Sequence, residues 1–349
     1  MNINDTLLDI VTQCSWEYSC WDDEIGHFLT SKTSSTFIER QEEAIRISRS
    51  ILKAHGKAEL LGCLEDLAKV ETNIRELEPW VRDHVVHALL TYILGIFVNE
   101  KFIKPSCGDP VNPFQWKLAG LLHDVGYPVE IAQNLMKPFT TKLNDLRREF
   151  GATESVRFQV MPVRLNKLAN KKDSLVLIQQ QLEKWELSID VAEEYSRMMK
   201  SGKVCHGIIS ALAVLNVIDS MYQCYNPERK YESTVPREQN LDYNQKYFDV
   251  DIVPACSAIF IHNLPPIAFS KTKIKCSKAP LPFLLNLCDC LQDWERPSLE
   301  NHNGLPANLF DIQIKGGKIF FHADIPAKES LRLKQSIFDY LDTDRVQII

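Results

Sequence analysis

The chain is poor in the features that mark secreted, membrane-spanning and nucleic-acid-coating proteins. Residues 1–5 contain neither a basic segment nor an apolar run, so we expect no secretory signal. The longest uncharged, mainly apolar run near the first helix of the larger domain, Ala88–Val98, has eleven residues, and a membrane span needs about 20. That run therefore predicts a buried core helix. The net charge of -6 argues against a general nucleic-acid-coating role.

The chain also lacks any Cys-x-x-Cys pair, although it has ten cysteines. The nearest approach is Cys288-Asp-Cys290. This spacing favours neither a thiolate zinc cluster nor a disulfide framework, so we expect reduced cysteines and a cytoplasmic location. The content of 45% hydrophobic and 25% charged residues is typical of a soluble globular protein. A length of 349 residues allows one large domain or two ordinary ones.

Most of the chain shows the periodicity of helices. Residues 1–78 predict an N-terminal helical scaffold, in which apolar residues recur two turns apart, as Phe37, Ala44 and Ile51 do. Residues 79–300 predict a larger helical domain that begins at Pro79 and contains a basic helical insertion at about 130–200. Residues 301–349 predict a small subdomain with a β-hairpin around Gly316-Gly317, a helix at 329–341 and a last strand. The predicted fold class is mainly α, with a small C-terminal α+β subdomain.

The basic insertion has a local charge excess that the rest of the chain lacks. Between Lys137 and Lys172 there are nine Lys or Arg residues and three acidic ones. Such a run is typical of a solvated face, and the alternative is a wall that binds an anion.

The segment Trp116–Pro128 carries a His and an Asp side by side. The apolar helix over 117–122 leads directly into His123-Asp124, and Gly126 and Pro128 are expected to end that helix. Successive residues of a helix point about 100° apart, so the two side chains can straddle a point off the helix. An isolated pair would be interpreted as a helix cap and a solvated carboxylate.

Other polar residues occur at the ends of apolar helices or inside them, and this changes the interpretation. A buried ionisable group must be paired or bound to metal. Four imidazoles and two carboxylates suit a first-row divalent metal and are too rich in nitrogen for calcium. His84 is a rival to His87 for the first position. The six candidate ligands are His87, His123, Asp124, His206, His262 and Asp289.

The order His, His-Asp, His, His, Asp resembles the HD-domain metal-dependent phosphohydrolase superfamily over about residues 80–295. The matching motifs are His87 in the first helix, Leu-Leu-His-Asp-Val-Gly at 121–126, His206-Gly207, Ile261-His-Asn263 and Leu287-Cys-Asp289. The resemblance implies an HD-domain-like helical bundle. It also favours His87 over His84, because Ala-Leu-Leu-Thr-Tyr-Ile-Leu-Gly follows His87, as in the superfamily's first helix.

The resemblance further implies one or two divalent metal ions, of Mn, Fe, Mg, Ni or Zn. The first would be held by His87, His123, Asp124 and Asp289. The second would be held by His206 and His262, with Asp124 bridging both and acting as the catalytic carboxylate. The implied activity is hydrolysis of a nucleotide or another phosphate ester by a metal-activated water. The expected partner is therefore a small phosphorylated substrate, and no membrane is expected. The acidic net charge disfavours nucleic acid without excluding it, and a homo-oligomer is left open.

Substrate recognition needs cations near the metals, and arginine suits phosphate best. Arg147 and Arg148 are candidates, because their helix could fold back over the site, and so is Lys271 in the basic loop 271–278. A solvent-facing arginine pair is the alternative.

Two departures from the superfamily leave the substrate branch open. Related cyclic-dinucleotide phosphodiesterases carry Lys at the position of Tyr127, and a His pair at His262-Asn263. Related deoxynucleotide triphosphohydrolases have a further His and a Pro-Phe segment where this chain has Tyr127-Pro128-Val129. Phosphomonoesterase, phosphodiesterase and nucleotide phosphohydrolase activities all stay open. The second hypothesis is a catalytically weak or inactive HD-fold nucleotide sensor.

Overall fold

The computed structural model describes residues 2–13, 22–31, 36–54, 57, 60–75, 82–108, 110–151, 153, 165–169, 171–224, 247–296 and 305–349. Several sequence predictions lie outside these residues. They are the domain boundaries 78/79 and 300/301, the start of the larger helical domain at Pro79, and the basic residues Arg157 and Arg164. The described part is mainly α, as predicted, with one small sheet near its C-terminus.

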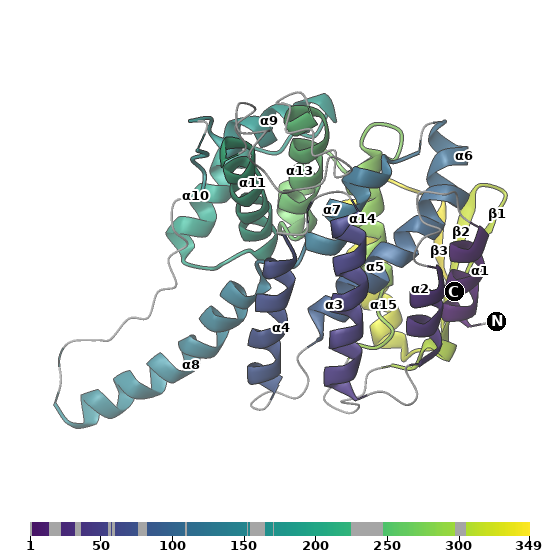
Figure 1. Cartoon of the computed structure of the whole chain (residues 1–349). Coiled ribbons are helices and arrows are strands. Elements are labelled where there is room, and N and C mark those ends of the chain that lie inside the picture. Colours follow the sequence, from purple (N-terminus) through teal and green to yellow (C-terminus); the bar gives the residue numbers. More distant parts are fainter. Residues whose placement is uncertain are drawn as a thin grey trace, which may run out of the picture.

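Five apolar helices form the centre of the molecule (Figure 1). They are α5 (His84–Val98), α7 (Pro113–Leu122), α11 (His206–Cys224), α13 (Val253–His262) and α14 (Pro280–Leu291). Every residue of α5 and α13 is buried. Helices that are apolar all round must be covered on all sides, and the other elements provide that cover.

The first central helix begins directly after a capping residue. Asp83 caps it by accepting hydrogen bonds from the backbone N–H groups of Val85 and Val86, so α5 begins at His84. It continues into η4 (Asn99–Ile103) and α6 (Lys104–Cys107). The run His84–Ser106 is long and apolar enough to cross a membrane by composition, but 89% of its apolar window is buried inside the molecule. The prediction of a core helix is confirmed.

Helices α5 and α7 approach each other closely at Gly95. The ring of Trp116 lies where a Cβ on Gly95 would stand, 1.8 Å from the nearest ring carbon. The Trp116 indole N–H donates to the carbonyl of Tyr92 at 3.0 Å, and the side chain is fully buried. This contact packs the first turns of α7 against the C-terminal half of α5.

Four N-terminal helices pack around this centre: α1 (Ile3–Gln13), α2 (Asp22–Thr30), α3 (Phe37–Lys53) and α4 (Leu61–Arg75). Helix α2 turns one face to the core. Ile25, Phe28 and Leu29 bury one face of that helix at helical spacing. Thr36 starts α3 with a capping box. The buried apolar residues of these helices are continuous with those of the central helices.

Three helices lie in the described part of the predicted basic insertion. They are α8 (Tyr127–Glu149), α9 (Ser174–Lys184) and α10 (Val191–Ser201). Pro128 was expected to help end the helix before it. It lies instead in the first turn of α8, where the missing N–H costs nothing. Helix α8 extends from the body of the molecule (Figure 1), whereas α9 packs against α13.

The C-terminal region forms the predicted hairpin and helix. Strands β1 (Phe310–Lys315) and β2 (Lys318–Ala323) pair antiparallel, and β3 (Val346–Ile348) pairs parallel to β2. Gly316 and Gly317 have φ of 58° and 69°, as a two-residue hairpin turn requires. Helix α15 (Ala327–Tyr340) connects β2 to β3 and packs on α14. Three short helical segments join these elements: η6 (Phe248–Ile252), η7 (Pro266–Phe269) and η8 (Ala307–Leu309).

Candidate metal centre

All six predicted ligands lie together where the central helices meet. His87 is in the second turn of α5, His123 directly follows α7, and Asp124 lies in the turn between α7 and α8. His206 is the first residue of α11, His262 is the last residue of α13, and Asp289 is in the last turn of α14. Five separate helices thus bring one or two polar side chains each to a common point.

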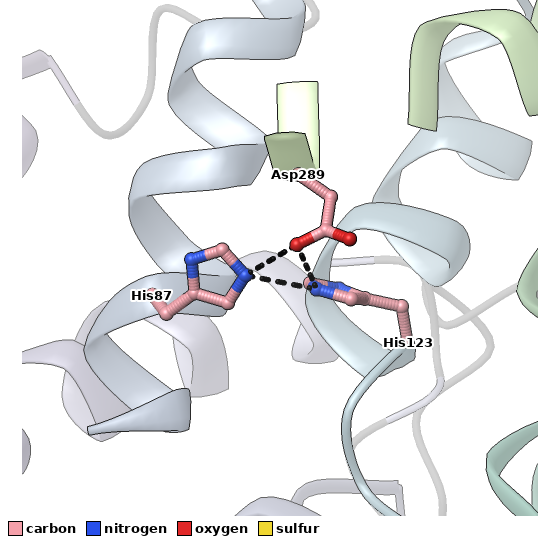
Figure 2. A group of neighbouring side chains, drawn as sticks. All are labelled: His87, His123 and Asp289. Carbon is pink, nitrogen blue, oxygen red and sulfur yellow. Dashed lines mark hydrogen bonds and ion pairs between the residues drawn. The ribbon is translucent and has the colours of Figure 1, made fainter. Parts of the chain in front are cut away.

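One half of the cluster consists of His87, His123 and Asp289, which point toward one another (Figure 2). Nε2 of His87 lies 2.9 Å from Oδ1 of Asp289 and 3.2 Å from Nε2 of His123. Nε2 of His123 lies 3.8 Å from the same Asp289 oxygen. His84, the rival for the first position, belongs to no such group among the described residues.

The other half consists of His206 and His262, whose Nε2 atoms are 3.2 Å apart. Asp124 joins the two halves through its two oxygens. Oδ1 lies 3.2 Å from Nε2 of His206 and 3.5 Å from Nε2 of His262. Oδ2 lies 3.3 Å from Nε2 of His123 and 3.7 Å from Nε2 of His87. The carboxylate therefore faces all four imidazoles.

Each imidazole is anchored through its other nitrogen. Nδ1 of His123 lies 3.0 Å from the carbonyl of Gly120, and Nδ1 of His262 lies 2.6 Å from that of Ile259. Nδ1 of His206 lies 2.8 Å from the Glu130 carboxylate. All three partners accept hydrogen bonds, so these Nδ1 atoms carry the proton and their Nε2 atoms face the cluster.

His87 is anchored by an amide whose orientation is fixed. Its Nδ1 contacts Oε1 of Gln292, and Nε2 of Gln292 donates to the carbonyl of Trp294 at 2.7 Å. Because that donor bond sets which amide atom is oxygen, Nδ1 of His87 donates its proton to Gln292. In the neutral imidazole, Nε2 then presents a lone pair to the Asp289 carboxylate at 2.9 Å. Two acceptors at this distance repel each other unless a proton or another cation lies between them.

The donor set fits a divalent transition metal. With nitrogen or oxygen ligands at about 2.1 Å, neighbouring donors around such a metal lie about 3.0 to 3.4 Å apart. The closest contacts within the cluster, 2.9 to 3.3 Å, fall near this range. Two overlapping groups each have three ligand atoms within 4.8 Å of one another: His87, His123 and Asp289, and His123, Asp124 and His262.

The protonation states of the two halves differ. Burial lowers the pKa of His87, and it lowers that of His123 to about 4, so both are neutral at pH 7. Burial would also lower the pKa of His206, but hydrogen bonds to Asp124 and Glu130 outweigh it and raise that pKa to about 10. The adjacent imidazoles hold the pKa values of Asp124 and Asp289 below the ordinary value despite burial, so both carboxylates are ionised.

Four of the six side chains are almost fully buried, and the two partly exposed ones, Asp289 and His206, define what we call the open edge of the cluster. The side chains of His87, His123 and His262 are at most 1% exposed, and that of Asp124 is 6% exposed. The side chains of Asp289 and His206 are 25% and 14% exposed. Solvent and ligands therefore reach the cluster past these two residues.

Glu130 and Gln292 support the cluster, and neither was predicted. Glu130 lies in the first turn of α8 and also accepts from the backbone N–H of His206 at 3.1 Å. Gln292 caps the C-terminus of α14. A weak signal for Glu130 exists in the sequence, because it lies on the same helix face as Tyr127, three residues earlier, and directly after the His-Asp turn.

A close approach at Gly126 determines how the start of α8 packs against α11. The backbone N–H of Gly126 donates to Oγ of Ser210 at 2.8 Å. A Cβ at Gly126 would lie 2.7 Å from the carbonyl oxygen of His206. This contact brings the turn that carries Asp124 against the first turn of α11.

The predicted substrate residues do not join the cluster. Helix α8 continues straight on from Tyr127, so Arg147 and Arg148 lie roughly 30 Å further along its axis, at about 1.5 Å per residue. The expectation that they fold back over the site is wrong. Arg148 pairs instead with Asp145 at 3.2 Å. Lys271 is exposed in the loop after η7, and among the described residues no hydrogen bond or ion pair joins it to a candidate ligand.

Other cations lie closer to the open edge. Arg82 donates to the side chain and backbone carbonyl of Gln292, and no carboxylate of the described residues lies within ion-pair range of it. Burial and the neighbouring Arg296 lower the pKa of Arg82 to about 10. Asp293 lies 3.1 Å from Arg296 and 2.9 Å from Arg332.

Comparisons of the chain with protein-family models, with curated proteins and with solved structures find no match. Residues and geometry alone therefore support the functional interpretation.

Proposed function

We propose that the chain is a metal-dependent phosphohydrolase of the HD-domain type, acting on a nucleotide or another phosphate ester. One observation supports this most directly. Each imidazole is anchored through Nδ1, and the four Nε2 atoms converge on two ionised carboxylates in a buried site. Such a site is costly without a cation, and the order of the ligands along the chain is that of the HD superfamily.

In this proposal His87, His123 and Asp289 would hold one metal, His206 and His262 would hold the second, and Asp124, which faces all four imidazoles, would contribute to both. Metals bound there lower the pKa of a water molecule and stabilise charge on a phosphoryl group. The protein fixes the ligands through Gln292 and Glu130, which orient the imidazoles at the two ends of the cluster.

The nearby arginines are better placed than Arg147 and Arg148 to bind phosphate. Arg82 is a partly buried cation with no carboxylate partner among the described residues, and it shares Gln292 with His87. The Arg296 side chain is 42% exposed and forms an ion pair with Asp293. An anion at the open edge would compensate both charges, and guanidinium groups bind phosphate oxygens in pairs.

The metal is tested first. We expect elemental analysis of purified protein to find a first-row metal, and His123→Ala and Asp124→Ala each to remove it. His27→Ala is the matched control, because His27 is 70% exposed on α2 and distant from the cluster in the sequence. Full metal content in both cluster variants would contradict the proposal.

Hydrolysis is tested with nucleotides, cyclic dinucleotides and generic phosphodiesters in the presence of manganese, magnesium, nickel or iron. Metal-dependent product release is the expected result. Arg296→Ala should raise KM and leave metal content unchanged. Arg197→Ala should change neither, since Arg197 is similarly exposed, at 44%, and pairs with Glu194 on α10. An unchanged KM in Arg296→Ala would remove that residue from substrate binding.

The alternative function is a nucleotide sensor that has kept the site without efficient turnover. Two contacts favour it. The ring of Tyr127 packs edge-on against His206 at a centroid distance of 5.5 Å. The Asn263 amide lies 2.9 Å from Nδ1 of His206. Both residues differ from those of related enzymes and flank the same ligand. Thermal stabilisation by a nucleotide without product formation would support the sensor.

A further inference from the structure

The outer half of α8 carries an apolar stripe that lies outside the hydrophobic core of the described residues. Ile131 is the only residue in this 23-residue helix that is classed as buried. Phe139, Leu146 and Phe150 are 57%, 50% and 82% exposed. The helix extends away from the body (Figure 1). An amphipathic helix normally turns its apolar face to a core, and exposed apolar patches of this kind mark interaction surfaces.

The stripe has the spacing of a coiled-coil seam. Met136, Phe139, Leu143, Leu146 and Phe150 follow one another at intervals of three, four, three and four residues. This is the alternation of the a and d positions of a heptad, with Met136, Leu143 and Phe150 at a. Pro138 falls at a c position, outside the seam. A strict two-position stripe favours another helix as the partner, because a helix that packs on a globular core needs a wider apolar face.

The charged residues beside the seam indicate which helix the partner is. Lys142 and Glu149 both occupy the g position, one heptad apart. In an antiparallel pair of helices, g residues face g residues of the partner. When Leu143 packs against Leu146 of a second copy, Phe139 packs against Phe150, and Lys142 lies opposite Glu149. The two-fold axis produces each of these contacts twice.

We propose that α8 pairs antiparallel with α8 of a second copy of this chain through this seam. The contact is charge-complementary in this register. A membrane surface fits less well, because helices that lie on membranes carry basic residues on the whole polar face. Here Asp145 and Glu149 interrupt the basic residues. The seam covers about two heptads, so the dimer is weak and its population depends on concentration.

The experiment measures association of the full chain by sedimentation velocity across roughly 1 to 100 μM, the range in which a micromolar dimer dissociates. The wild type should shift from monomer to dimer in this range. Phe139→Ser combined with Leu146→Ser should stay monomeric throughout. Leu331→Ser, a control at a 63% exposed position on α15, should behave as the wild type. Because all three positions are exposed, circular dichroism should show an unchanged fold.

A charge exchange tests the partner and the register. Lys142→Glu alone places like charges together twice across the axis, and so does Glu149→Lys alone. Each should weaken dimerisation about tenfold. The double variant Lys142→Glu/Glu149→Lys restores opposite charges and should recover wild-type association. Arg148→Glu is the outer-face control, since Arg148 lies at an f position away from the seam.

Three outcomes would overturn the proposal. The first is a wild type that is monomeric over the whole range. The second is a dimer that survives the loss of Phe139 and Leu146. The third is a double charge variant that associates no better than the single ones. A monomeric wild type that binds vesicles of anionic phospholipid through α8 would assign the seam to a membrane surface. None of these results depends on the metal content or on hydrolysis.

Discussion

Loading the half of the cluster that contains His206 should release a proton, and loading the half that contains His87 should not. With a pKa of about 10, His206 is an imidazolium at pH 7, and its Nε2–H donates to Asp124 at 3.2 Å. A metal can take Nε2 only after this proton leaves. Over the three pH units between 10 and 7, that costs about 4 kcal/mol at about 1.36 kcal/mol per unit. His87 and His123 are already neutral and carry no such cost.

We therefore expect two classes of metal affinity with different pH dependence. The affinity of the first should vary little between pH 7 and 9. The affinity of the second should rise about tenfold per pH unit up to pH 10. Calorimetric titration with manganese or zinc, repeated in buffers of different ionisation enthalpy, counts the protons released in each step. About one proton is expected for the weaker step and about none for the tighter one.

Glu130→Gln sharpens this test. Glu130 accepts from Nδ1 of His206 and helps to raise its pKa, so the variant should lower that pKa and flatten the pH dependence of the second step. The isosteric control is Glu183→Gln, at an exposed position on α9. Equal proton release in both steps, or a wild-type slope in Glu130→Gln, would refute the assignment of the proton to His206.

Three further predictions follow from the same contacts. His87→Ala should remove bound metal and His84→Ala should retain most of it, as elemental analysis would show. Gly95→Ala should destabilise the fold by about 1 to 3 kcal/mol in urea titration, because its Cβ would overlap the buried ring of Trp116. In EDTA, unfolding free energy should be greatest near pH 6.5. The raised pKa of His206 stabilises the fold at low pH, and this stabilisation is lost as pH rises from about 6.5 to about 10. The lowered pKa of His123 has the opposite effect, because the stabilisation it gives is lost as pH falls from about 6.5 to about 4.

The ligand positions could be predicted because each is an exception within an apolar helix. A polar residue such as His262, at the end of the run Val253–Ile261, has no solvent to face once the helix is buried. Its side chain must therefore meet other polar groups in the interior. The same reasoning applies to His87 and Asp289, and the hairpin follows equally from local chemistry at Gly316-Gly317. These predictions depend on burial alone and need no knowledge of how the helices are arranged.

The supporting residues could not be predicted in this way, because their role depends on packing between distant segments. Gln292 contacts His87 across 205 residues of sequence, and Glu130 contacts His206 across 76. The direction of α8 is a similar case. Pro128 is compatible with both the end of one helix and the first turn of the next. Only the packing of Gly126 against α11 decides between them, and that choice carries Arg147 away from the cluster.

The N-terminal scaffold, in which the sequence shows no chemistry, reaches the cluster through Glu71 of α4. Its carboxylate accepts from the backbone N–H of His84 at 3.0 Å and lies 2.5 Å from Nδ1 of the same residue. The rings of His84 and Tyr127 are in contact, with centroids 3.6 Å apart, and Tyr127 in turn packs on His206. Without α4, the buried Nδ1 of His84 would lose its acceptor, at a cost of about 1 to 3 kcal/mol. The packing of His84 and Tyr127 beside His206 therefore depends on Glu71, which precedes residue 79. Residues 79–300 alone do not make up the complete site.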